Sequence, residues 1–94
     1  MTLMEAIARK RAVLARYNGE DVRLAPHLLF ERHGELFLCA LNMGKAWRSD
    51  DERKLGQFKL AGLTEARLLE DDFDPLPSYA PTTPREDDTL ILAL

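Results

Sequence analysis

The most regular pattern of apolar and polar positions lies between residues 26 and 42. Two apolar runs, residues 27–30 and 36–41, flank a polar tip that contains Gly34, and this pattern predicts two strands joined by a short hairpin loop. In the second run both alternating sets of side chains are apolar: Leu36, Leu38 and Ala40 on one face, and Phe37, Cys39 and Leu41 on the other. A strand with one face in water alternates apolar with polar residues. We therefore expect both faces of residues 36–41 to be covered, one by the rest of a small barrel and the other by a helix.

The N-terminal residues predict an amphipathic helix over about residues 3–10. Thr2 and Glu5 have the spacing of a capping box, which satisfies free amide donors at a helix start. The apolar residues that follow fall on one helical face: Leu3, Met4, Ile7 and Ala8. We expect this face to cover the outer side of residues 36–41.

Turn residues mark a first hairpin before this central one. Asn18-Gly19 predicts a type I′ turn, because both residues tolerate a positive φ, and it joins expected strands at residues 12–17 and 21–25. Pro26 cannot donate to a strand ladder. It therefore predicts a bulge or bend where the strand changes its partner.

Two later strands complete the expected sheet. Residues 53–60 alternate loosely, Ala61-Gly62 interrupts them, and residues 63–69 form a last apolar run. Five or six short antiparallel strands behind one helix close most simply as a small barrel, which also removes edge strands. The expected fold class is therefore mainly β (α+β), a small antiparallel β-barrel with one N-terminal helix.

The composition changes at residue 70. The stretch from residue 70 to 87 holds four of the five prolines and six acidic residues, which predicts an extended, poorly packed segment. Residues 89–94, TLILAL, are apolar and prone to form a strand, so we expect them either to pair with a barrel edge or to add a strand to another copy. We divide the chain into a barrel domain, residues 1–75, and an extended C-terminal tail, residues 76–94.

The charge is unevenly distributed between these parts. Residues 1–69 carry twelve Lys or Arg and nine Asp or Glu, whereas residues 70–94 carry one Arg and seven acidic residues. Two interpretations remain open: an anionic ligand site on the basic part that the acidic tail shields, or a solvated body with a loose acidic end.

Several classes of protein are disfavoured by the sequence. No run approaches the roughly 20 apolar residues of a membrane span, and residues 1–11 lack the pattern of a signal peptide, so we expect a cytoplasmic protein. Cys39 is the only cysteine, and inside an apolar strand it predicts a buried, inert thiol. His27 and His33 have no acidic or Cys partner at a recognised metal spacing. With no phosphate loop and no catalytic triad motif, we expect no enzyme, no metal and no cofactor.

The order of features over residues 3–75 resembles the WYL domain. That family is named for a Trp-Tyr-Leu tripeptide in its central strand, and residues 36–38, Leu-Phe-Leu, occupy that place here. The surrounding residues match better in order and spacing: Tyr17, Gly19, Pro26, Gly34, Phe58, Leu60 and Phe73. The resemblance implies an SH3-type, Sm-like β-barrel, and this chain would be a standalone copy.

WYL domains are mostly bacterial and usually follow a winged-helix DNA-binding domain in transcription regulators. They are thought to sense negatively charged ligands, including nucleotides and single-stranded nucleic acid, and they are not enzymes as a class. In their late strand they typically read Arg-x-Phe-Arg-Leu-Asp-Arg-Ile. Here residues 56–63 carry Gly56, Ala61 and Gly62 in place of an Arg, the Asp and another Arg, and Lys59 remains as a flexible point charge.

The resemblance and the strand alternation together give a candidate ligand site: Tyr17, Arg23, His27, Lys54 and Lys59. Tyr17, His27 and Lys59 match or lie near family positions on the ligand face. Alternation puts Lys54 on the face of Gly56 and Arg53 on the opposite one. We expect a non-catalytic ligand-sensing or regulatory module that binds an anionic small molecule or short single-stranded nucleic acid, or modulates a partner regulator.

The alternative is a structural or protein-interaction module whose ligand site has decayed. It would contact a protein partner, or a second copy in a homodimer, through an apolar set: Trp47, Leu90, Ile91 and Leu92.

Overall fold

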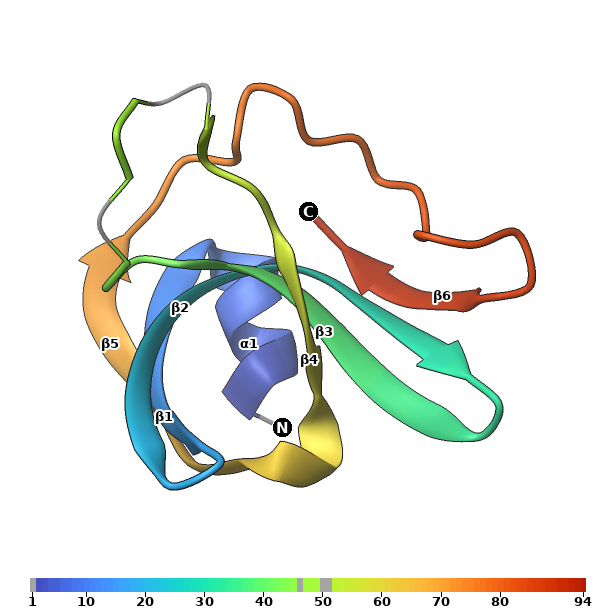
Figure 1. The fold of residues 1–94 in the computed structure, drawn as a ribbon, viewed down its shortest axis with the longest axis horizontal. Helices are drawn as coiled ribbons and strands as arrows, with labels where there is room; N and C mark the ends of the chain where they lie inside the picture. The colour runs from blue at the N-terminus through green and yellow to red at the C-terminus, as the bar shows by residue number, and fades with distance from the viewer. Residues whose placement is uncertain (1, 46, 50–51) are drawn as a thin grey trace.

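A computed structural model describes residues 2–45, 47–49 and 52–94 of the chain. Its elements, shown in Figure 1, follow in the order α1 (Thr2–Arg9), β1 (Arg11–Tyr17), β2 (Glu20–Arg32), β3 (Glu35–Asn42), β4 (Gly56–Lys59), the 3-10 helix η2 (Leu60–Gly62), β5 (Leu63–Asp72) and β6 (Thr89–Ala93). The prediction of a mainly antiparallel β fold with one short N-terminal helix is confirmed.

The strands form one curved sheet in the order β4-β3-β2-β1-β5, with β6 paired to β2 off this path. Every described pair is antiparallel. The two ends of the path, β4 and β5, are joined through η2, and a ladder between them is not among the described strand pairs.

Two tight turns set the register of the sheet. Asn18 and Gly19 have φ values of 52° and 84°, and His33 and Gly34 have values of 52° and 79°. Positive φ at both central residues is the mark of the type I′ turn. Both predicted hairpins are therefore confirmed, although the second loop has two residues instead of five, because the strands extend to Arg32 and Glu35.

Strand β2 continues through Pro26, where the sequence predicted a bulge and a change of partner. Its register against β3 shifts between Pro26 and Leu28. On its other edge, β2 pairs with β1 up to Leu24 and with β6 from Leu28 onward. The bulge is thus confirmed, and it separates the two partners on one edge of a single long strand.

Helix α1 packs on the face of the sheet that holds Leu38 and Ala40, which we call the inner face. Buried Leu3, Ala6 and Ile7 of the helix share one apolar cluster with these two residues, and the sheet curves around the helix (Figure 1). The expectation that α1 would cover the opposite side of β3 is wrong, because the helix fills the hollow of the curved sheet instead.

Over β3, the outer face, which holds Cys39 and Leu41, is covered by loops. Leu41 clusters with buried Leu76 and with Trp47, and Cys39 clusters with Leu55 and Tyr79. Burial of both faces is confirmed from Leu38 to Leu41, but Leu36 is 37% exposed, because neither layer reaches the hairpin tip.

Residues 73–94, here called the C-terminal segment, therefore complete the molecule by packing back onto the sheet. Its first part crosses the outer face with Leu76 buried, and its last part is β6, paired with residues 28–31 of β2. Two alternatives were expected for residues 89–94, pairing with an edge of the same sheet or adding a strand to another copy. In the structure they pair with β2 of the same chain. The division at residue 75 into two parts stays a prediction.

Candidate functional site

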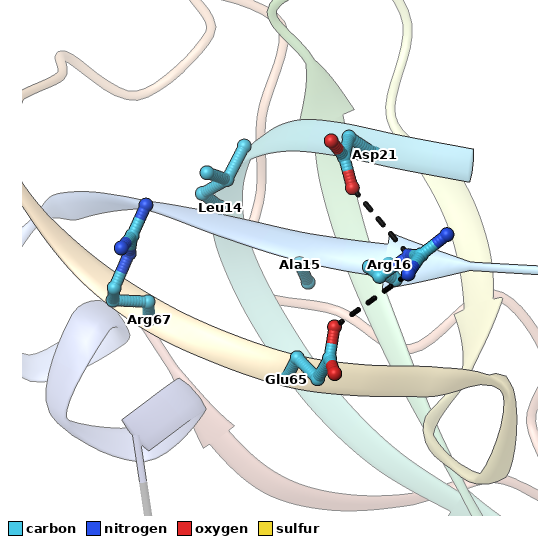
Figure 2. Close-up of a pocket in the computed structure, with 6 residues that line it drawn as sticks. All are labelled: Leu14, Ala15, Arg16, Asp21, Glu65 and Arg67. Atoms are coloured by element: carbon cyan, nitrogen blue, oxygen red, sulfur yellow. Dashed lines mark ion pairs between the residues drawn. The ribbon is translucent and has the colours of Figure 1, made fainter. Parts of the chain in front are cut away.

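A shallow cavity of about 400 Å³ lies on the outer face where β1, β2 and β5 run side by side, shown in Figure 2. Its lining residues are Leu14, Ala15, Arg16, Asp21, Glu65 and Arg67. The Asn18-Gly19 turn fixes the register that sets Asp21 opposite Arg16 and Arg23 opposite Leu14. Since directly opposite residues of an antiparallel pair share one face, the turn itself gathers this charged group.

Arg16 is held from three directions. Its Nε lies 3.6 Å from Asp21 Oδ1 and its Nη1 lies 3.9 Å from Glu65 Oε2, so the guanidinium sits between the two carboxylates (Figure 2). Its Nη2 also donates to the Gly19 carbonyl at 3.0 Å. These groups are about half exposed or more, so the ion pairs are weak and a ligand can replace them.

Glu65 reaches the cavity from a bulge in β5. The β1–β5 register shifts between Leu14 and Arg16, whose partners are Arg67 and Thr64. Glu65 has a φ of 54°, a conformation that is uncommon for residues other than Gly. The bulge turns this carboxylate toward Arg16, and local strain of this kind often accompanies a functional site.

Two more arginines flank Leu14. Arg23 of β2 and Arg67 of β5 both lie directly opposite it in the sheet. Arg23 pairs with Asp71, whereas Arg67 makes no ion pair in the part of the chain that the structure describes. Three guanidinium groups thus come from three neighbouring strands on one face.

The structure does not bring together the five residues predicted to bind a ligand. Arg23 is the one that lies beside the cavity. The Tyr17 ring meets the Phe58 ring edge to face at 5.1 Å, Lys59 pairs with Glu35 at 3.0 Å, and Lys54 is exposed in the chain before β4.

His27 lies in the interior and is fully buried. Its Nδ1 lies 2.8 Å from the Ala25 carbonyl, and its Nε2 accepts a hydrogen bond from the Leu76 amide at 3.1 Å. Burial is the main cause that lowers the pKa of His27, against a smaller rise from the Ala25 hydrogen bond. The imidazole is therefore a neutral structural contact here, with both nitrogens occupied.

The residues expected to contact partners differ in exposure. Trp47 is half-buried, donates from Nε1 to the Asn42 carbonyl at 3.4 Å and carries Lys45 Nζ 4.5 Å above its ring. Leu90 and Ile91 are 46% and 40% exposed, whereas Leu92 packs at the border of the inner apolar cluster.

The Cys39 thiol is not activated as a nucleophile. Burial raises the pKa of the Cys39 thiol to about 11, which keeps it protonated near neutral pH. The described residues contain no group of three or more His, Cys, Asp or Glu side chains suited to a metal ion. None of the described helices has the length and apolar character that crossing a membrane requires.

Sequence reasoning did not select Arg16, Glu65 and Arg67. The signal for Arg16 was present, because alternation sets it beside Leu14 and the turn sets Asp21 across from it. Arg67 gave no such signal, because the bulge at Glu65 changes the register of β5.

Comparisons with protein-family models, curated proteins and solved structures found no match to this chain. The resemblance to the WYL domain therefore stays a prediction from the sequence.

Proposed function

We propose that this chain is a non-catalytic binding module of WYL type, built on an SH3/Sm-like barrel, that senses a small anionic ligand. The strand order β4-β3-β2-β1-β5 with a 3-10 turn between β4 and β5 supports the barrel. Two further contacts support closure at that corner: Tyr17 at the end of β1 pairs with Leu63, and its ring meets Phe58 of β4.

The proposal of an anionic ligand rests on the three arginines around Leu14, which are Arg16, Arg23 and Arg67. Exposed ion pairs such as those of Arg16 contribute about 0–1 kcal/mol, so a phosphate or carboxylate loses little by displacing Asp21 or Glu65. A guanidinium binds such groups through two parallel hydrogen bonds, and Arg67 pairs with no carboxylate among the described residues. The cavity volume of about 400 Å³ lies in the range of small-molecule sites.

The ligand class follows from this chemistry. A nucleotide or a short single-stranded nucleic acid offers phosphates for Arg16 and Arg67, and half-buried Leu14 between them offers an apolar surface. We place the module in the cytoplasm, where binding of such a ligand would modulate a partner regulator.

Calorimetric titration with ATP, pyrophosphate and a short oligothymidylate tests this proposal. We expect Arg67→Gln and Arg16→Gln to weaken binding by about tenfold or more, because each removes charge-assisted hydrogen bonds, and we expect affinity to fall as salt rises. Arg48→Gln is the matched control, since Arg48 is 90% exposed and pairs with Glu52 in the loop after β3. Equal affinity of the parent and Arg67→Gln for every ligand would exclude the site.

A second candidate is self-association through β6. Leu90 and Ile91 are large apolar side chains exposed on a strand without charged residues, and such edge strands are prone to pair with another chain. This candidate corresponds to a structural or interaction module, and it does not require the arginine cavity.

A further inference from the structure

His27 is the point at which the C-terminal segment is attached to β2. The Leu76 amide donates to its Nε2 at 3.1 Å, and the Leu94 amide donates to its carbonyl at 3.0 Å. The Tyr79 hydroxyl also donates to this carbonyl at 3.3 Å. The rings of Phe73 and Tyr79 lie 5.2 Å and 5.1 Å from the imidazole. One buried side chain and its carbonyl thus hold four positions of the segment.

The hydrogen bonds fix the protonation state of this side chain. Because the Leu76 amide is a donor, Nε2 must be unprotonated, and Nδ1 then carries the hydrogen that the Ala25 carbonyl accepts. If Nε2 were also protonated, its N–H would point at the N–H of Leu76, and two donors cannot form a hydrogen bond. The closed arrangement and a protonated His27 are therefore incompatible.

Within the described residues, the ring nitrogens have no negatively charged partner. The titratable groups packed around His27 in that part of the chain include Tyr79 of the segment and Cys39 of β3, and burial raises the pKa of both, so both are neutral near pH 7. Asp72 and Asp74 flank Phe73 and line a neighbouring cavity together with Arg53, whereas both ring nitrogens face backbone groups.

We propose that His27 is a pH-sensitive latch, and that protonation of Nε2 releases the C-terminal segment from the sheet. Release would uncover the edge of β2 at residues 28–31, where β6 now pairs. It would also uncover Leu28, Phe30 and Cys39, which the segment now helps to bury. The module would present a closed surface at neutral pH and an open apolar sheet in acid.

Proton linkage sets the direction and the pH range in which the closed form is lost. Burial lowers the pKa of His27 from 6.5, so the closed form is fully favoured above about pH 6.5 and is progressively lost below it. One linked proton changes the opening equilibrium by up to tenfold per pH unit.

Two other contacts join the segment to the hairpin of β2 and β3. The pKa of Asp88 is lowered from 3.8, so its bond to Arg32 persists throughout this range. His33, in the turn between β2 and β3, lies 4.0 Å from Asp87 of the segment, and a variant at His33 therefore serves as the control.

Amide hydrogen exchange of Leu76 and of residues 89–93, followed from about pH 8 to 5 and corrected for intrinsic exchange, tests the latch. We expect opening to increase by up to tenfold per pH unit below pH 6.5 in the parent. His27→Gln keeps an acceptor and a donor but cannot titrate, so its opening should not change with pH. His33→Asn, which keeps a residue tolerant of positive φ, should retain the dependence.

A nitrogen-detected NMR titration of the parent gives a second measurement if His27→Gln does not fold. The Nε2 resonance should show the unprotonated form at neutral pH, and its protonation should coincide with loss of Leu76 protection. Opening that does not vary between pH 7 and 5, or a dependence that disappears in His33→Asn, would overturn the proposal.

Discussion

Gly62 lies against the ring of Tyr17. A Cβ at this position would lie 3.4 Å from Tyr17 Cδ1 and 2.9 Å from Tyr17 Cε1, and the shorter of these distances is closer than packed atoms allow. The Tyr17 ring has little room to move, because Phe58 contacts it edge to face. The Gly at position 62 therefore has a local reason, which is the close approach of this aromatic ring.

We predict that Gly62→Ala lowers the free energy of unfolding by about 1–3 kcal/mol, the usual cost of overpacking. Urea unfolding measures the change. Gly44→Ala is the control, since its Cβ would meet only Asn42 Oδ1 at 3.5 Å, and its effect should stay within about 0.5 kcal/mol. Equal unfolding midpoints for Gly62→Ala and the parent would show that the ring yields easily.

At the scale of elements, β6 is fastened at its start by a buried ion pair. Asp88 accepts hydrogen bonds from Arg32 Nε at 2.6 Å, from Arg32 Nη2 at 2.9 Å and from the Arg85 amide at 2.9 Å. The hydrogen bond from Arg32 is the main cause that lowers the pKa of Asp88. The guanidinium also lies over the Phe30 and Phe37 rings, at 5.0 Å and 5.3 Å, so the hairpin tip and β6 are tied together.

We predict that Asp88→Asn increases opening of β6 by about tenfold or more, because it leaves a charged guanidinium without its carboxylate. The parent should lose this contribution as the pH falls below about 3.8, whereas the variant should show no such loss. Hydrogen exchange of residues 89–93 gives the first value, and unfolding midpoints across acidic pH give the second. Asp87→Asn, at a more exposed carboxylate 4.0 Å from His33, should have little effect in either measurement.

The elements differ in how far the sequence predicts them. Both hairpins were predictable, because two residues with positive φ decide each turn. The face of the sheet that α1 covers was not predictable, because β3 is apolar on both faces and an apolar helix face can pack on either. The covering of the outer face depends on Leu76 and Tyr79, which reach β2 from about 50 residues away, and no local pattern records such a contact. In the cavity, the positions of Arg16 and Asp21 follow from the register that the turn sets. The position of Arg67 depends on a bulge in β5 that no sequence pattern predicts.

At the scale of the whole molecule, the acidic stretch lies on the basic part of the chain. Asp71 pairs with Arg23, Asp88 with Arg32, and Asp87 lies near His33. Residues 70–94 carry most of the excess negative charge, and the fold uses part of it to neutralise arginines of β2. Among the described residues, Arg67 has no part in these ion pairs.

Self-association through β6 also belongs to this scale. If β6 mediates it, we predict a dimer by light scattering that Ile91→Lys converts to a monomer with the same unfolding midpoint. Ile91 sits at the register shift between Leu90 and Leu92 and is 40% exposed, so the change should spare the pairing with β2. Met4→Lys, at a similarly exposed residue of α1, should leave the dimer intact. A parent that stays monomeric as its concentration rises would remove this candidate.

The shared edge of β2 has a consequence for how the chain folds. Strands β1, β2 and β3 are joined by two-residue turns, so their pairing closes short loops and should form early. The second half of the β2 edge pairs with residues about 60 positions later in the chain, and closing so long a loop costs more entropy. During synthesis, the edge of β2 at residues 28–31 therefore stays unpaired until β6 has left the ribosome. In that interval the growing chain is most exposed to misassembly.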